Sequence, residues 1–324
     1  MQRNLCALVS PFSSPQPPRR SSGGWLSHAT FAAFAASQTD AHRLATVSEG
    51  WVERFGGDIL LSYKNEAARD SLLDGLREWS AAETFAPQRV FGKFLPKQNA
   101  ERIAPVLIEG DATLPLLTTV TENGVRYGLD FGAGYSAGLF IDQRANRAFV
   151  RREAPRRLLN TFAYTCSFSV VAALTGAETV SIDLSKKSID RGRENFALNN
   201  LEATKHRFYA DDVLDVLPSL ARKREQFDII ILDPPTFSRG NKGRRFQVEQ
   251  DLQALLLAAL EVAAPRAKIL LSTNCTRLHR RALENIAHFA CKSTRSAADF
   301  HAEPPLPDIP AEAAAQTLWL LLKS

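Results

Sequence analysis

The chain has 324 residues, enough for about two domains, and its 45 % hydrophobic and 23 % charged residues exclude disordered, collagen-like and disulfide-scaffold classes. No apolar run reaches the roughly 18 residues of a membrane helix, which excludes a spanning protein. The net charge of +5 permits a polyanionic partner without requiring one. Four cysteines without metal-ligand spacing indicate neither a disulfide framework nor a metal site.

Residues 1–43 differ from the rest of the chain because Ser, Ala and Pro dominate and Asp40 is the only acid. Such a composition predicts a disordered leader without a packed core. Its arginines and serines also fit an organellar transit peptide, and an upstream start codon is a third explanation. We expect a cytoplasmic protein, with an organellar location as the alternative.

A small α+β domain is expected over residues 44–120. It contains a strand at 58–63, a helix at 66–79 and a strand, turn and helix group within 85–108. Two apolar runs, 117–121 and 125–131, flank Asn123-Gly124, which is a strong signal for a β-hairpin. The hairpin and a connecting segment occupy residues 121–150.

Strands alternate with helices over residues 151–324. Near-continuous apolar strands in such an alternation predict an α/β Rossmann-like sheet that is mostly parallel, with helices on both faces. Ligands bind outside the carboxyl ends of the strands in sheets of this kind. The expected strands are 157–162, 179–183, 205–209, 227–232, 268–273 and about 318–322, and the expected helices are 167–175, 185–199, 213–224, 248–263 and 280–290.

Polar and small residues follow the first three of these strands. The turn after the first strand can aim backbone amides at a ligand, but it lacks G-x-G-x-x-G, which counts against a dinucleotide site. Asp183 follows Thr165 at the spacing of about 20 residues at which an acid binds a ribose diol. Its alternative role as a helix cap is weakened because Ser185 is available. Asp211 and Asp212 can accept from an adenine amine or cap the next helix.

The fourth strand ends in the sharpest signal of the sequence, Asp233-Pro234-Pro235. Prolines remove amide donors and leave a rigid array of carbonyl acceptors that, with Asp233, can grip a planar group bearing N–H donors. Phe237 can stack on that group. A basic run follows, which is either a solvated loop or a clamp for RNA phosphates, and it comprises Arg239, Lys242, Arg244 and Arg245.

These motifs together resemble the class I S-adenosylmethionine-dependent methyltransferases that modify bacterial 23S rRNA, in particular the cytosine-C5 and guanine-N7 enzymes. The resemblance runs from about Arg43 to the C-terminus. The first motif commonly has Gly-Gly where this chain has Cys166-Ser167. The segments that carry the resemblance are 121–124, 138–144 with Arg147, 160–168, 180–186, 194–199 and 232–238.

The resemblance implies S-adenosylmethionine as cofactor and ribosomal RNA as partner. Asp233, Pro234 and Pro235 would hold the target base, and Phe237 and the basic run would contact RNA. The implied cofactor residues are Phe162, Ala163, Tyr164, Thr165 and Ser167 for the methionine part, Asp183 and Leu184 for the ribose, and Asp211, Asp212 and Val213 for the adenine. Gln143 and Arg144 are expected on the cofactor or substrate side.

The methylated base depends on Cys275, which follows the fifth strand where the family's cytosine enzymes carry a nucleophile. A thiolate is needed there to make 5-methylcytosine. The motif Asp-Pro-Pro-Thr-Phe-Ser matches the guanine enzymes better, and Cys275 can also be a buried packing residue. We therefore keep both products, with 5-methylcytosine favoured. A nucleotide-dependent oxidoreductase and a non-catalytic RNA-binding relative are the competing functions.

Overall fold

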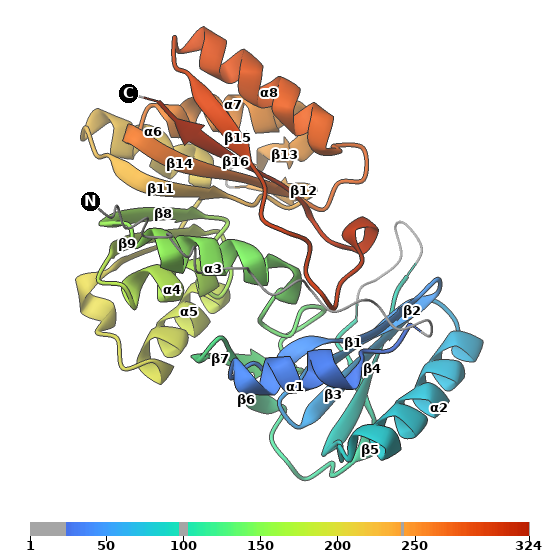
Figure 1. The fold of residues 1–324 in the computed structure, drawn as a ribbon. Helices are drawn as coiled ribbons and strands as arrows, with labels where there is room; N and C mark the ends of the chain where they lie inside the picture. Colours follow the sequence, from blue (N-terminus) through green and yellow to red (C-terminus); the bar gives the residue numbers. More distant parts are fainter. Residues whose placement is uncertain (1–23, 97–102, 241–242, 324) are drawn as a thin grey trace, which may run out of the picture.

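The computed structural model describes residues 24–96, 103–240 and 243–323, which form two sheets with their covering helices (Figure 1). The N-terminal part is a five-stranded sheet in the order β1-β2-β3-β4-β5. Only β3 and β4 run parallel within it, since α2 connects them. Its elements are α1 (His28–Ala36), β1 (Ala41–Val47), β2 (Gly50–Phe55), β3 (Asp58–Tyr63), α2 (Glu66–Glu83), β4 (Arg89–Phe94) and β5 (Val106–Gly110).

The prediction of a disordered leader is wrong for residues 24–43, while residues 1–23 lie outside the described part. The Leu26 amide donates to Leu44 O at 2.6 Å, and the Trp79 indole donates to Leu26 O at 2.8 Å. The rings of Trp25 and Trp79 stack with centroids 6.2 Å apart. A few large apolar side chains in an Ala- and Ser-rich segment are therefore enough to fold it onto α2, because aromatic burial dominates over average composition.

The helix expected within residues 85–108 is absent from the part of that stretch that the structure describes, which contains β4 and the start of β5 instead. The β-hairpin is confirmed as β6 (Leu117–Glu122) and β7 (Val125–Asp130). Asn123 and Gly124 both have positive φ, 50° and 77°, as a type I′ turn requires. Next come η1 (Ile141–Gln143) and a helix that the sequence did not predict, α3 (Arg144–Glu153).

The C-terminal part confirms the α/β prediction. Its seven-stranded sheet has the order β10-β9-β8-β11-β14-β16-β15; the first five strands run parallel, and β16 runs antiparallel to both of its neighbours, β14 and β15. Its strands are β8 (Arg157–Thr161), β9 (Glu178–Asp183), β10 (Arg207–Ala210), β11 (Phe227–Leu232), β14 (Ala263–Thr273), β15 (Ala298–His301) and β16 (Gln316–Leu322). Its helices are α4 (Ser167–Ala173), α5 (Lys186–Leu198), η2 (Ala203–Lys205), α6 (Val213–Arg222), α7 (Val248–Leu260), α8 (Arg280–Ser293) and η4 (Ala311–Ala313).

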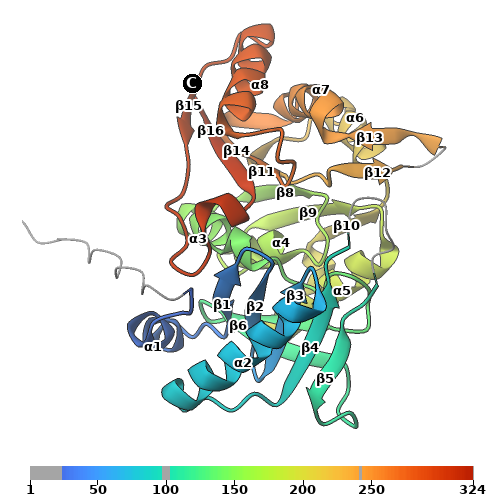
Figure 2. The ribbon, with the colours of Figure 1, turned by 90° about the vertical axis from the view of Figure 1, so that its right-hand side faces the viewer.

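Both faces of this sheet are covered, as alternate residues of each strand show. Leu158 packs with α3, α4 and α5 in one core, whereas Leu159 packs with α6, α7 and α8 in the other. Neighbouring residues of a strand point to opposite faces, so a strand between two helical layers must be apolar throughout. Figure 2 shows the N-terminal sheet on one side of this domain.

None of the described helices is long and apolar enough to cross a membrane.

Candidate active site

The loop after β8 has an unusual backbone. Phe162, Tyr164 and Cys166 have positive φ values of 52°, 47° and 60°, which non-glycine residues adopt only where the surroundings enforce it. The Ala163 amide donates to Ile182 O at 2.9 Å, and Thr165 Oγ1 donates to Gly138 O at 2.6 Å. The loop therefore takes the conformation of a glycine-rich turn without containing glycine.

Cys166 shows how this glycine-free turn is accommodated. Its side chain is buried, and a Cβ added at Gly192 of α5 would lie 2.4 Å from Cys166 Sγ. Because Gly192 has no side chain, it leaves the space that the Cys166 side chain fills. Replacing the family's common Gly-Gly by Cys166-Ser167 therefore changes the side-chain packing, while Cys166 keeps a positive φ. Burial raises the pKa of the Cys166 thiol to about 12, which keeps it protonated and unreactive.

Asp183 lies directly beside this loop. Its Oδ2 accepts from the Tyr164 amide and its Oδ1 from the Ser185 amide, both at 2.8 Å. Burial raises the pKa of the carboxyl, and these two hydrogen bonds oppose the rise. Ser185 Oγ caps α5 through the Ser188 amide at 3.1 Å, as predicted. Asp183 is therefore fixed at the strand end without being the helix cap.

Asp211 and Asp212 follow β10 at the same edge of the sheet. The Asp211 amide donates to Asp183 O at 3.0 Å, which places the two strand ends side by side. Asp212 is 5 % exposed and caps α6, because its Oδ1 accepts from the Leu214 amide at 2.9 Å. Val213 is fully buried in the core under α6. Asp212 therefore has the capping role, in which its Oδ2 takes no part.

A short hairpin that the sequence did not predict covers Asp212. It consists of β12 (Phe237–Arg239) and β13 (Arg245–Gln247), paired antiparallel. A Cβ added at Gly240 would lie 2.2 Å from Asp212 Oδ2, so only glycine allows this approach. The hairpin and the strand ends enclose a small pocket lined by Phe162, Leu184, Asp212, Leu214, Ser238, Gly240, Arg244 and Phe246.

The basic run lies on this hairpin. Arg244 pairs with Asp215 at 3.0 Å and lies 3.7 Å from Asp212, so carboxylates already engage its charge. Arg239 and Arg245 are exposed, and Lys242 lies outside the described residues. Phe237 is 48 % exposed at the start of the hairpin. Besides the paired Arg244, the hairpin therefore presents one aromatic ring and two further arginines to solvent.

Asp233 follows β11, with Pro234 buried and Pro235 exposed. Burial raises the pKa of Asp233 to about 6, a hydrogen bond from Ser272 opposes the rise, and the nearby Asp142 adds to it. Gln143 Nε2 donates to Ser272 Oγ at 2.9 Å. Gln143 and Ser272 thus form a chain of hydrogen bonds that ends on Asp233. A carboxyl in this state can hold or release a proton near neutral pH.

Arg144 lies elsewhere than the sequence suggested. Its guanidinium donates to Ala41 O at 3.1 Å, pairs with Asp308 and lies over the ring of Phe34. These contacts join the N-terminal sheet to the C-terminal domain. They give no support to the predicted cofactor or substrate role of Arg144.

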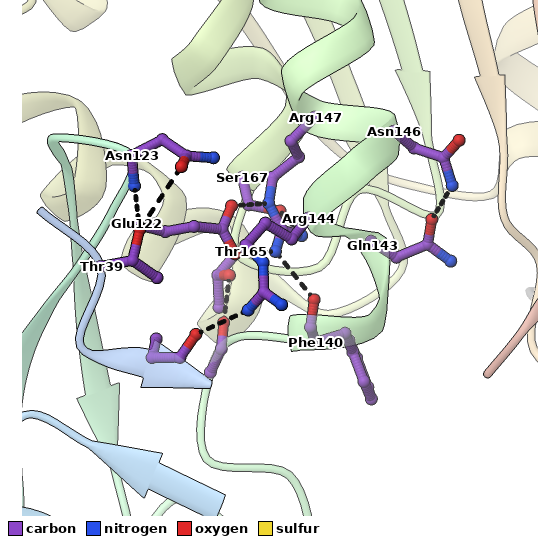
Figure 3. Close-up of polar contacts among 12 residues, drawn as sticks. Thr39, Glu122, Asn123, Phe140, Gln143, Arg144, Asn146, Arg147, Thr165 and Ser167 are labelled. Atoms are coloured by element: carbon purple, nitrogen blue, oxygen red, sulfur yellow. Dashed lines mark hydrogen bonds and ion pairs between the residues drawn. The ribbon is translucent and has the colours of Figure 1, made fainter. Parts of the chain in front are cut away.

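Arg147 is also buried and paired (Figure 3). Its Nε and Nη2 donate to the two carboxylate oxygens of Glu122 at 2.7 and 2.6 Å, and Nη2 also donates to Phe140 O at 2.9 Å. Ser167 Oγ lies 3.5 Å from Nη1. Arg147 therefore connects the β6–β7 hairpin, α3 and the start of α4, which follows the loop after β8.

Cys275 follows β14 and is 5 % exposed. Its thiol donates to Glu249 Oε1 at 3.4 Å, and the same oxygen pairs with Arg277 at 2.6 Å. Glu249 lies in the first turn of α7. Sequence reasoning missed Glu249 and Ser272, because only the fold brings them next to Cys275 and Asp233.

A cavity of about 360 Å³ lies apart from these strand ends, between the turn of the β6–β7 hairpin, α3 and α4. None of the residues predicted for the cofactor or the target base lines it. In the described part of the chain, no three His, Cys, Asp or Glu side chains gather into a metal-binding group.

Known proteins share this fold. The crystal structure of SMU.776 complexed with SAH aligns with a TM-score of 0.78 at 24 % identity, covering 91 % of this chain and 78 % of that one. The SAM-dependent methyltransferase from Agrobacterium tumefaciens aligns with a TM-score of 0.68 at 21 % identity, covering 88 % and 90 %. At these identities the likeness shows the fold alone.

Curated relatives match in sequence. Ribosomal RNA large subunit methyltransferase I of Erwinia tasmaniensis is 32 % identical over 249 residues, which are 74 % of this chain and 62 % of that protein. Ribosomal RNA large subunit methyltransferase K/L of Psychrobacter sp. is 40 % identical over 163 residues, 49 % of this chain and 20 % of that protein. The chain thus spans less than two thirds of the length of these relatives. A family described as S-adenosylmethionine-dependent methyltransferase matches residues 50–322, and the chain belongs to this family.

Proposed function

We propose that the protein transfers a methyl group from S-adenosylmethionine to a base of 23S ribosomal RNA. The observation that carries the proposal is the convergence of the strand ends: Asp183 ends β9, and Asp212 and Asp233 follow β10 and β11, at one edge of the sheet around the loop after β8. Family membership and the large-subunit RNA named for the curated relatives support the same function.

The residues at this edge fit the cofactor. The backbone of the loop 162–166 would face the methionine part, and Asp183 is fixed where a ribose diol can donate to it. Asp212 would accept from an adenine amine next to Leu184 and Phe162 in the small pocket, where its Oδ2 now lies 3.7 Å from Arg244. Bound S-adenosylmethionine supplies an activated methyl group, so the protein has mainly to position the acceptor.

Asp233 and the carbonyls next to its prolines would hold the target base. A carboxyl whose pKa is about 6 can donate a hydrogen bond to a ring nitrogen or accept one from an amine. A base inside a helix cannot reach this position, so the substrate is single-stranded or flipped out. The exposed ring of Phe237 offers a surface for stacking beside the base.

The contact between Cys275 and Glu249 favours 5-methylcytosine over a guanine product. A thiolate that adds to C6 of cytosine makes C5 nucleophilic; after C5 gains the methyl group, its proton leaves as the C–S bond breaks. Glu249, whose Oε1 accepts from this thiol at 3.4 Å and also pairs with Arg277, would take the thiol proton. Without a nucleophilic role, Cys275 would be a packing residue and guanine the target.

RNA is the proposed partner of the exposed hairpin, with Arg239 and Arg245 on its phosphates. Lys242 belongs to the same proposal, although it lies outside the described residues. We also propose a cytoplasmic location, because the curated relatives are bacterial proteins named for ribosomal RNA.

Calorimetry tests the cofactor part of this proposal. We expect S-adenosylmethionine to bind at micromolar concentration and NAD not to bind, since the first turn lacks G-x-G-x-x-G. Asp183→Asn is expected to weaken binding, whereas Asp228→Asn, near the amino end of β11 and thus at the opposite edge of the sheet, leaves it unchanged. Absence of S-adenosylmethionine binding by the wild-type protein would refute the methyltransferase function.

A further inference from the structure

One face of the N-terminal sheet carries buried polar atoms that lack partners. The strand register puts Thr46, Trp51, Ser62 and Lys93 in one row across β1 to β4, with Arg43 and Glu53 beside it. Paired residues of neighbouring strands share a face, so these side chains gather on one surface. We call these six residues the polar face.

The unpartnered atoms concentrate on this face. Among the described residues, nine buried side-chain nitrogen or oxygen atoms have no hydrogen-bond partner, and five belong to the polar face. They are Arg43 Nε and Nη1, Thr46 Oγ1, Trp51 Nε1 and Ser62 Oγ. A buried donor without an acceptor costs stability, so such a concentration points to a ligand that supplies acceptors.

The polar face is directed at the active site. The charges of Arg43 and Glu53 both act on the pKa of Asp142, and Asp142 in turn raises the pKa of Asp233. Lys93 Nζ lies 5.1 Å from the ring centroid of Tyr135, the residue next to Ser136. Ser136 O accepts from the Tyr164 hydroxyl at 2.8 Å, within the loop after β8. The polar face thus adjoins both the base site and the cofactor loop.

The chemistry of these groups indicates what they bind. Arg43 is 6 % exposed and its Nη2 donates to Glu53 at 3.1 Å, while Nε and Nη1 of this buried guanidinium have no hydrogen-bond acceptor. The guanidinium, the indole N–H and the Lys93 ammonium are all donors, and both cations lie over the Trp51 ring, 5.1 and 5.8 Å from its centroid. Phosphate oxygens and base carbonyls are matching acceptors, and single-stranded RNA carries both.

We propose that the polar face is the second wall of the active site, and that it binds the RNA nucleotide presented to Asp233. This inference rests on the proposed methyltransferase function and adds the N-terminal domain to substrate recognition. Arg43 and Lys93 contact the phosphate or a base carbonyl, while Trp51 and Ser62 supply further hydrogen bonds.

Two conservative variants of the full chain test the inference with S-adenosylhomocysteine bound. Trp51→Phe keeps an aromatic ring and removes the N–H, and Ser62→Ala removes one hydroxyl. Each is expected to weaken binding of a short single-stranded RNA of mixed sequence by about three- to tenfold, the effect of one hydrogen bond. The melting temperature without RNA should stay the same or rise, because an unpartnered polar atom is removed.

Ser80→Ala is the matched control, since its hydroxyl is also buried and unpartnered but lies in α2 on the opposite side of the sheet. It should leave RNA binding unchanged. Wild-type RNA affinity in both test variants would overturn the inference, as would a drop in melting temperature without a change in RNA affinity. Failure of the wild-type protein to bind S-adenosylhomocysteine would instead remove the proposed function on which the inference rests.

Discussion

Asp233→Asn should make the protein more stable and inactive. The amide keeps the size of the carboxyl and can still accept from Ser272, but it cannot ionise. In the wild-type protein, burial raises the pKa of Asp233 from an ordinary 3.8 to about 6. This difference corresponds to up to about 3 kcal/mol of unfolding free energy, at about 1.4 kcal/mol for each pKa unit.

The sign follows from proton linkage. Between pH 4 and pH 6 the folded protein holds the Asp233 proton while the unfolded chain has lost it, so stability falls as pH rises through this range. This loss of unfolding free energy is absent at pH values below the pKa of Asp233 in the unfolded chain, and it is complete above its pKa in the folded protein. The variant lacks this cost, so its advantage over wild type should be near zero at pH 3.5 and reach up to about 3 kcal/mol at pH 8.

Urea unfolding followed by circular dichroism measures this difference at the two pH values. Methyl transfer to ribosomal RNA, assayed in parallel, should fall at least about 100-fold, while binding of S-adenosylmethionine is retained. Asp233→Ala should show the same separation of activity from cofactor binding. A variant that is less stable than wild type at pH 8, or that turns over equally well, would refute the role assigned to Asp233.

Three further changes test other parts of the site. Glu122→Gln leaves the buried guanidinium of Arg147 without its carboxylate and should cost about 3–5 kcal/mol of unfolding free energy; a loss below about 1 kcal/mol would show that the ion pair is unimportant. Cys275→Ala should abolish methylation if the product is 5-methylcytosine, and activity equal to that of a Cys291→Ala control would leave guanine as the target. Replacing Arg239 and Arg245 by Gln should reduce the slope of log affinity for single-stranded RNA against log salt by about 1.4, and an unchanged slope would exclude phosphate contacts.

The strand ends could be predicted because they depend on local sequence. A parallel strand buried on both faces is an apolar run, and the residue after it must lie at the ligand edge of the sheet. Asp183 could therefore be assigned from its position at the end of 179–183, and Asp233 from its position directly after 227–232. Ser185 could be recognised as a helix cap for the same reason.

Helix α3 could not be predicted from periodicity. Three of its five buried residues are polar, and these three, Arg144, Asn146 and Arg147, find partners outside the helix. A hydrophobic pattern fails where ion pairs and hydrogen bonds replace apolar contacts. Arg144 was assigned to the ligands on resemblance alone, whereas its partner Asp308 is distant in sequence and only the fold brings them together.

The β12–β13 hairpin was missed because its strands are three residues long and its sequence is basic and glycine-rich. Such a run is typical of a solvated loop. Tertiary contacts stabilise this hairpin, because Gly240 packs on Asp212 and Arg244 pairs with Asp215. The polar face could not be predicted from the sequence either, since its unpartnered atoms come from separate strands and share no motif.

The central claim is that the protein methylates a base of 23S ribosomal RNA. Mass spectrometry of rRNA nucleosides from cells with and without the protein tests this claim most directly. We predict that one methylated nucleoside, with 5-methylcytosine favoured, is depleted in cells that lack the protein and returns with the wild-type gene but not with Asp233→Ala. Identical nucleoside profiles in the two kinds of cell would contradict the claim.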